Sequence, residues 1–462
     1  MELRDYAACD ATELRRLLSA GEVTAAELRD AALRAIEAVD PHLNATVSGP
    51  YDDAEGDIPF AAKDTLSEAG RPLGFGTRLL DGFVAKRDAT LAERFRAAGL
   101  ASLVRSATPE FAFNLDTAPV SHGQTRNPWN PEHSPGGSSG GAAALVASRA
   151  LPLAHANDGG GSIRVPAAWC GLVGLKPSRG RVPLGPSVGE AVGGFAHEFV
   201  VTRSVRDAAW LLAAISGPAA GDRYYVAPFA PGPAPGPLRV ALHTESFFGV
   251  DTAPDVRAAV EDAARALESL GHTVEPACPK LNTEQLRRCV TDVWSVDLAE
   301  LAATFAAATG RDVDTHVEAA SRACIHHGRD LTALDLQDAA RVVNSTGRRW
   351  GRFLDDYDLF LCPTTPTAAT ASGTPDQDDA AIDSAEEWID RVFSLSPFTP
   401  LANLTGQPSI SLPLGTSAGG LPLGVMLTAQ TLREDVLLGV AAQLEQALPW
   451  AAGTPKIDAA AS

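Results

Sequence analysis

Short apolar runs alternate with helical patterns along this chain of 462 residues. The strand-like run IPFAAKD at 58–64 is followed by helical patterns at 89–100 and 141–150, and a strand-to-helix pattern recurs at 200–216. Near the end, strand-like runs at 408–414 and 421–429 precede a helical pattern at 433–448. Such alternation is typical of a mixed α/β core.

Two other regions are mainly helical. Residues 11–39 have apolar side chains at helical spacing around a break that contains glycine, which predicts two amphipathic helices packed on a larger body. The Ala-rich segment 255–345 is also predicted to be mostly helical. A Pro/Gly/Ala tract at 227–237 precedes a predicted strand, and we interpret it as a connection inside the fold.

The composition excludes several classes of protein. Acidic residues outnumber basic ones by 57 to 38, for a net charge of −19, which argues against a general surface for nucleic acid or anionic membrane. No run approaches the roughly 18 apolar residues that a membrane helix needs, and the N-terminus does not read as a secretion signal. Six widely spaced cysteines without a CxxC pair fit a reducing compartment, so we expect a cytoplasmic protein.

The segment ANDGGGSIRVP at 156–166 places three glycines directly before Ser162. Glycine is the usual residue where the backbone needs positive φ, so one interpretation is a surface turn. The alternative is a nest of backbone N–H groups beside a nucleophilic serine. That alternative requires a base elsewhere in the chain to activate the hydroxyl.

A second Gly/Ser-rich segment, SPGGSSGGAAALVASRA, formally matches the G-x-S-x-G nucleophile elbow around Ser138. An elbow follows a buried strand, whereas the residues before this segment, NPWNPEHSP, are too rich in Pro and Asn for one. The other interpretation is that Ser138 or Ser139 caps the following helix.

Two possible bases can be compared. Lys63 follows an apolar run, where a charged amine is costly to bury without partners, so either a structural ion pair or catalysis would explain it. His155 lies near Ser162 in the chain, but a Ser-His-Asp arrangement needs proximity in space, which the sequence does not establish. The pair His326 and His327 lacks a second cluster of metal ligands, so no metal site is predicted.

Together these segments resemble the amidase signature hydrolases. The resemblance is carried by the lysine of IPFAAKD, by SPGGSSGGAAA and by NDGGGSIRVPAAWCGLVGLKPSRGR, and it extends to TRNPWNP, LCPTTP and PFTPLANLTGQPSISLPLG. It implies an α/β fold with a central mixed sheet of many strands, covered on both faces by helices. We expect a single domain over 1–462, with N-terminal helices in 1–45, a catalytic core in 58–225 and a helical substrate-cavity region in 255–345.

The resemblance also implies roles for individual residues. Ser162 is the expected nucleophile, Ser138 the bridging serine held by a cis peptide bond, and Lys63 the base. The expected oxyanion donors are the backbone N–H groups of Gly159, Gly160, Gly161 and Ser162. Ser139, Asp158 and Arg164 are expected to support the site, and Ser139 to cap its helix and touch Lys63. Trp169 and Cys170 either pack behind the loop or narrow the substrate pocket.

The implied reaction is hydrolysis of a carboxylic amide through an acyl-enzyme, without a metal or cofactor. The implied partner is a small-molecule amide, with neither nucleic acid nor membrane. The sequence leaves open whether the protein forms a homodimer. Three alternatives use the same chemistry: transfer of the acyl group to an amine, ester cleavage, and the role of an amidotransferase A-type subunit within a complex. The sequence does not identify the amide.

Overall fold

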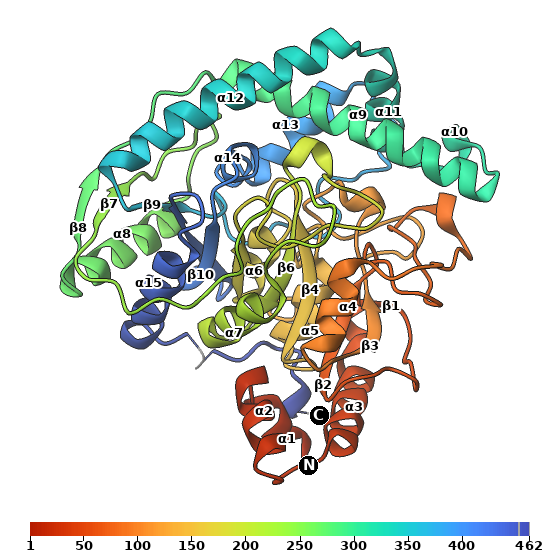
Figure 1. Ribbon diagram of the computed structural model, residues 1–462, viewed down its shortest axis with the longest axis vertical. Helices are drawn as coiled ribbons and strands as arrows, with labels where there is room; N and C mark the ends of the chain where they lie inside the picture. Colours follow the sequence, from red (N-terminus) through yellow and green to blue (C-terminus); the bar gives the residue numbers. More distant parts are fainter. Residues whose placement is uncertain (451–452, 462) are drawn as a thin grey trace.

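The structure is a computed structural model that describes residues 1–450 and 453–461 (Figure 1). Within these residues, eleven strands form one sheet in the order β1-β3-β2-β4-β6-β5-β10-β11-β9-β7-β8. The strands are β1 Thr46–Ser48, β2 Ile58–Lys63, β3 Leu100–Ser106, β4 Leu153–Asp158, β5 Val173–Lys176, β6 His197–Thr202, β7 Arg239–Leu242, β8 Thr273–Pro276, β9 Leu359–Pro363, β10 Ser409–Thr416 and β11 Pro422–Ala429.

The sheet is mixed. β2 runs parallel to β3 and β4, and β7 runs parallel to β8 and β9, while the other pairs are antiparallel. The described part of the chain also contains fifteen α-helices, so the predicted α/β class is confirmed. They are α1 Leu3–Ala8, α2 Ala11–Ser19, α3 Ala25–Leu43, α4 Thr90–Ala97, α5 Gly140–Ala147, α6 Arg164–Cys170, α7 Val205–Ile215, α8 Pro254–Ser269, α9 Thr283–Thr309, α10 Val313–His316, α11 Ala319–Asp330, α12 Ala333–Asp356, α13 Ala385–Leu395, α14 Pro400–Thr405 and α15 Glu434–Ala447.

Helices pack on both faces of the sheet because its side chains alternate between the faces. On β11, a Cβ at Gly424 would lie 2.3 Å from the Cβ of Ala168, so α6 approaches this face closely. The neighbouring Leu423 points to the other face, where a Cβ at Gly415 would meet both Leu423 and Ala259 of α8. The absence of a side chain at these two glycines allows the close approach.

The N-terminal helices form as their pattern predicts. Asp10 accepts a hydrogen bond from the backbone N–H of Glu13 and caps α2, while Thr24 and Glu27 form a capping box at the start of α3. The pattern did not predict α1, which is only six residues long. The short helical turn Ala459–Ala461 packs against α1 (Figure 1), and the Ala459 backbone N–H donates to the Ser148 carbonyl oxygen.

Four helices of the second half, α9, α11, α12 and α13, lie over one end of the sheet. The long helices α9 and α12 cross the top of the view in Figure 1, with α11 and α13 beside them. The predicted helical segment 255–345 also contains the edge strand β8, which the Ala-rich pattern did not reveal. Across residues 1–450 and 453–461, no helix combines the length and the hydropathy of a membrane span.

Candidate active site

Strand pairing brings Lys63 to the glycine loop. β2 and β4 are parallel, with Ala61 opposite Ala154. Lys63 is the last residue of β2 and Asp158 the last residue of β4, so both lie at the same edge of the sheet. The segment that follows β4 is Gly159–Ser162, and it leads directly into α6.

Lys63 is completely buried and has three polar partners. Its Nζ donates to Ser138 Oγ at 2.7 Å, to Ser139 Oγ at 3.0 Å and to Asn157 Oδ1 at 2.6 Å. None of these partners carries a charge. Burial lowers the pKa of Lys63 to about 7, against the opposing attraction of Glu198 and Asp158. Three donated hydrogen bonds require the ammonium form of Lys63. With a pKa of about 7, this ammonium can lose a proton near neutral pH, and the neutral amine can then accept one from a neighbouring hydroxyl.

Ser138 and Ser139 lie directly before α5, and both are buried. The peptide bond between Gly137 and Ser138 is cis. Ser139 occupies the N-cap position of α5, but its side chain makes no capping hydrogen bond and instead accepts from Lys63. The prediction that the Ser139 side chain caps α5 is therefore wrong, whereas the predicted contact between Ser139 and Lys63 is present. The Ser139 backbone N–H donates to the Ser162 carbonyl oxygen at 3.3 Å, which joins the two serine segments.

The carboxylate of Asp158 holds the glycine loop. Its Oδ1 accepts the Gly161 N–H at 2.7 Å, and its Oδ2 accepts the Ile163 N–H at 3.2 Å. Gly161 has φ +141°, a backbone conformation that favours glycine. Because the Gly161 N–H is used inside the loop, it is not aimed at a substrate.

A buried ion pair fixes this carboxylate. Arg164 donates to Asp158 through Nη2 at 2.8 Å and Nε at 2.9 Å, and both side chains are fully buried. Burial alone would raise the pKa of Asp158, but the charge of Arg164 and hydrogen bonds from Arg164 and Asn403 outweigh it, so the pKa lies below its ordinary value. Arg164 also donates to the Thr399 carbonyl and to Asn403 Oδ1, which ties the loop to α14.

Aromatic side chains from distant parts of the chain lie directly against Gly159 and Gly160. A Cβ at Gly159 would lie 2.7 Å from the ring of Trp294 on α9, and a Cβ at Gly160 would lie 2.9 Å from the ring of Phe393 on α13. Trp294 is stacked on Phe113, with ring centroids 5.0 Å apart. Two aromatic rings therefore cover the loop from the helical side, and a side chain at either glycine would displace them.

Trp169 and Cys170 lie in α6, behind the loop, and both are buried. The Trp169 indole donates to Thr365 Oγ1 at 3.2 Å, and Cys170 Sγ lies 3.3 Å from the Pro135 carbonyl oxygen. Burial raises the pKa of the Cys170 thiol, which keeps it protonated. These contacts favour packing behind the loop, and a substrate-pocket role for either residue stays a prediction.

Asn157 is a site residue that sequence reasoning missed. Its amide oxygen takes one of the three Lys63 hydrogen bonds, and its amide nitrogen donates to Thr65 Oγ1 at 2.9 Å. The one feature of the sequence that could have indicated Asn157 is its position directly before Asp158, in the segment that contains the glycines.

His155, the alternative base, is instead directed at the backbone of β2, because its Nδ1 accepts the Lys63 backbone N–H at 3.2 Å. Within the described residues, no group of three or more His, Cys, Asp or Glu side chains could hold a metal ion.

Comparisons with known proteins agree with this geometry. The family model described as Amidase matches residues 23–438. The 6-aminohexanoate-cyclic-dimer hydrolase of Paenarthrobacter ureafaciens is 37% identical over 97% of this chain and 96% of its own. A solved structure of 6-aminohexanoate cyclic dimer hydrolase has a TM-score of 0.91 at 34% identity, with 99% of each chain covered. A bacterial aryl acylamidase has a TM-score of 0.85 at 25% identity, covering 97% of this chain and 99% of its own. Matches of this extent show that the chain belongs to the amidase signature family.

Proposed function

We propose that this amidase cleaves its substrate with Ser162 as nucleophile, Ser138 as proton relay and Lys63 as base. The observation that carries the proposal is the buried Lys63 amine, 2.7 Å from Ser138 Oγ and free of a carboxylate partner in the described residues. An amine with a pKa of about 7 can take up a proton at neutral pH, which an ordinary lysine cannot. The Ser139–Ser162 backbone hydrogen bond holds the nucleophile segment beside this relay.

The proposed cycle conserves its protons. Ser162 Oγ attacks the amide carbon as its proton moves to Ser138, and the Ser138 proton moves to Lys63. The ammonium returns a proton along the same path to the leaving amine as the carbon–nitrogen bond breaks. Water then repeats the sequence on the acyl-enzyme and releases the acid. A hydroxyl suits the middle position because it both donates and accepts.

The negative charge that develops on the carbonyl oxygen needs donors. Among the expected backbone groups, Gly161 already donates to Asp158, which narrows the proposed oxyanion donors to Gly159, Gly160 and Ser162. One such donor typically contributes about 3–4 kcal/mol to lowering the barrier. Asp158 thereby acts indirectly, because its hydrogen bonds shape the loop that presents the other N–H groups.

The substrate is a small amide, and the cavity is proposed to lie under the helical region. Trp294 on α9 and Phe393 on α13 cover the glycine loop with apolar surface, which supports the expectation that residues 255–345, together with α13, shape the acyl pocket. Relatives named for a cyclic dimer of 6-aminohexanoate and for aryl acylamides suggest neutral cyclic, linear and aryl amides as first substrates. All six cysteines are free thiols, which supports the proposed cytoplasmic location.

Trapping the acyl group tests the proposed function. When the enzyme turns over a cleaved amide in the presence of hydroxylamine, we expect the hydroxamate to form at the expense of the acid. Mass spectrometry of enzyme quenched during turnover of a slow substrate should find the acyl mass on the peptide that contains Ser162. An acyl mass on another residue, or hydrolysis with no covalent species and no hydroxamate, would contradict the mechanism.

The two alternatives for Trp169 lead to different results. We expect Trp169→Ala to lower the free energy of unfolding by about 3–5 kcal/mol, because it removes a large, fully buried ring. The ratio of kcat/KM values for amides with short and bulky acyl groups should stay the same. Urea unfolding and steady-state kinetics measure the two quantities. A variant that accepts bulkier acyl groups would instead assign Trp169 to the pocket.

A further inference from the structure

A carboxylate behind Lys63 has no part in the proposed proton relay. Glu198 lies on β6, directly opposite Asn157 of β4 in the sheet. Its Oε2 is 2.7 Å from His155 Nε2, and its Oε1 accepts from Asn157 Nδ2 at 3.4 Å. Both partners also contact Lys63, since Asn157 accepts from the Lys63 side chain and His155 from the Lys63 backbone N–H. Glu198 therefore reaches Lys63 by two hydrogen-bonded routes.

The hydrogen bonds define the charge of this network. Because His155 Nδ1 accepts the Lys63 N–H, the pattern assigns the ring proton to Nε2, from which it is donated to Glu198. The imidazole is then neutral and does not cancel the carboxylate charge. Within residues 1–450 and 453–461, Glu198 forms no ion pair with a lysine or arginine. Its attraction for Lys63 opposes the effect of burial on the Lys63 pKa.

The other charged groups around Lys63 have their own partners. Asp158, next to it on β4, is paired with Arg164. Arg105 on β3 donates to the Lys63 carbonyl oxygen at 3.1 Å and is paired with Asp64 and Glu68. Glu198 is thus the acid near Lys63 whose charge is not balanced by an arginine.

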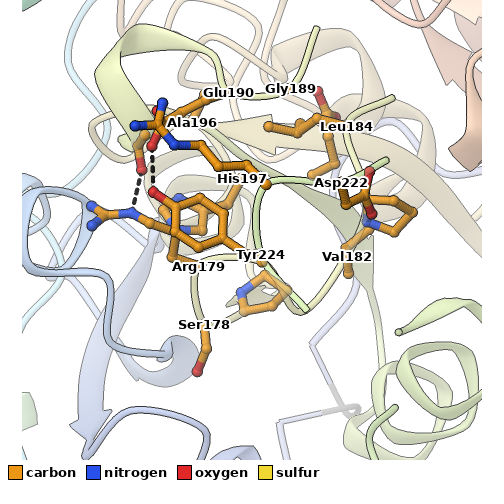
Figure 2. A pocket seen from close by; sticks show the side chains of 16 residues that line it. Ser178, Arg179, Val182, Leu184, Gly189, Glu190, Ala196, His197, Asp222 and Tyr224 are labelled. Carbon is orange, nitrogen blue, oxygen red and sulfur yellow. Dashed lines mark hydrogen bonds and ion pairs between the residues drawn. The ribbon is translucent and has the colours of Figure 1, made fainter. Parts of the chain in front are cut away.

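Glu198 is one of the residues that line a small pocket. Figure 2 shows Arg179, Glu190 and Tyr224 at one side of the pocket and Asp222 at the other. The space open to the centres of water molecules is about 30 Å³, which is room for about two waters. The Glu198 side chain is 18% exposed, and both of its carboxylate oxygens bond the network around Lys63.

We infer that Glu198 is a positioning residue of the amidase reaction, which orients Lys63 through Asn157 and His155 and stabilises its ammonium form as the proton of the nucleophile arrives. The inference rests on the proposed function of Lys63 as base. Glu198 keeps its charge throughout: the proton moves from Ser162 through Ser138 to Lys63 and returns to the leaving amine. The carboxylate favours the protonated amine by electrostatic attraction and fixes the amide of Asn157 so that its oxygen faces Nζ.

The pH profile of Glu198→Gln tests this inference. In the wild type, kcat/KM should rise through about pH 7, because Lys63 must be neutral to act as base. Removing the charge of Glu198 disfavours the ammonium form of Lys63. The acidic limb of the kcat/KM profile, where kcat/KM rises with pH, should therefore shift to lower pH by about 1 unit, and the kcat/KM plateau above it should fall several-fold. Loss of packing alone would lower the plateau without moving the limb.

A matched control lies in the same pocket. Glu190 bonds Tyr224 and Arg223 and makes no contact with His155 or Asn157, so Glu190→Gln should leave the acidic limb in place. Glu198→Asp, which keeps the charge, should retain the wild-type limb and serves as the second variant if Glu198→Gln does not fold. A wild-type limb in folded Glu198→Gln, or a shifted limb in Glu198→Asp, would overturn the inference. Failure of Lys63 as base would appear separately, as retained activity in Lys63→Met.

Discussion

Replacing Ser162 by alanine is expected to lower kcat by on the order of 10⁴-fold or more, with the fold intact. The substitution removes the atom that forms the acyl-enzyme bond, yet it deletes only a hydroxyl from a side chain that is already buried. Lys63→Met should cause a loss of similar size, because methionine fills the space of the lysine stem but cannot accept a proton. Steady-state kinetics on a cleaved amide, with circular dichroism as the test of folding, measures both effects.

The two losses should not add. Since Ser162, Ser138 and Lys63 are proposed to act as one unit, Ser162→Ala/Lys63→Met should be no slower than either single variant. The adjacent serines provide a matched pair, because both accept a hydrogen bond from Lys63. We expect Ser138→Ala to lower kcat by about 10²–10⁴-fold, because it removes the proton relay, and Ser139→Ala to lower kcat far less. Equal losses for the two serines, or folded Lys63→Met with wild-type activity, would contradict the assignment.

Much of this site was predictable because its residues lie in short, distinctive segments. Lys63 ends an apolar strand, and Ser138 and Ser162 follow runs of glycine whose flexibility the local backbone requires. The contact between Lys63 and Ser139 was also expected. These predictions depend on local sequence and on the resemblance of whole segments, so they did not require knowledge of tertiary packing.

The remaining features depend on packing between distant segments. Thr399, directly before α14, and Asn403, within α14, contact Arg164 from more than 230 positions along the chain, which no local pattern reveals. The use of the Gly161 N–H by Asp158 depends on the exact path of the loop. Glu198 meets Asn157 through antiparallel strand register, and a glutamate at the start of an apolar strand gives no sign of its partner.

The buried ion pair beneath the loop leads to the second large prediction, which concerns stability. Asp158→Asn is expected to lower the free energy of unfolding by about 3–5 kcal/mol, because it leaves the Arg164 guanidinium buried without a counter-charge. Activity should fall as well, since the carboxylate accepts the loop N–H groups of Gly161 and Ile163. Urea unfolding at pH 7 measures the change in the free energy of unfolding. The control is Asp30→Asn, which breaks an exposed ion pair with Arg34 and should lower the free energy of unfolding by at most about 1 kcal/mol.

The double variant distinguishes loss of a charge partner from loss of a packing residue. Asp158→Asn/Arg164→Met removes the unpaired charge, so it should be more stable than Asp158→Asn alone while remaining inactive or nearly so.

The pH dependence of the free energy of unfolding gives a further check. The pKa of Asp158 lies below its unfolded value of about 3.9, so its contribution to stability is present above that pH and is lost only as the pH falls further. Asp158→Asn should therefore lose less stability than the wild type between about pH 4 and pH 2. If instead the double variant is less stable than Asp158→Asn and the acid dependence is unchanged, Arg164 stabilises the loop through its hydrogen bonds to α14 rather than through its charge.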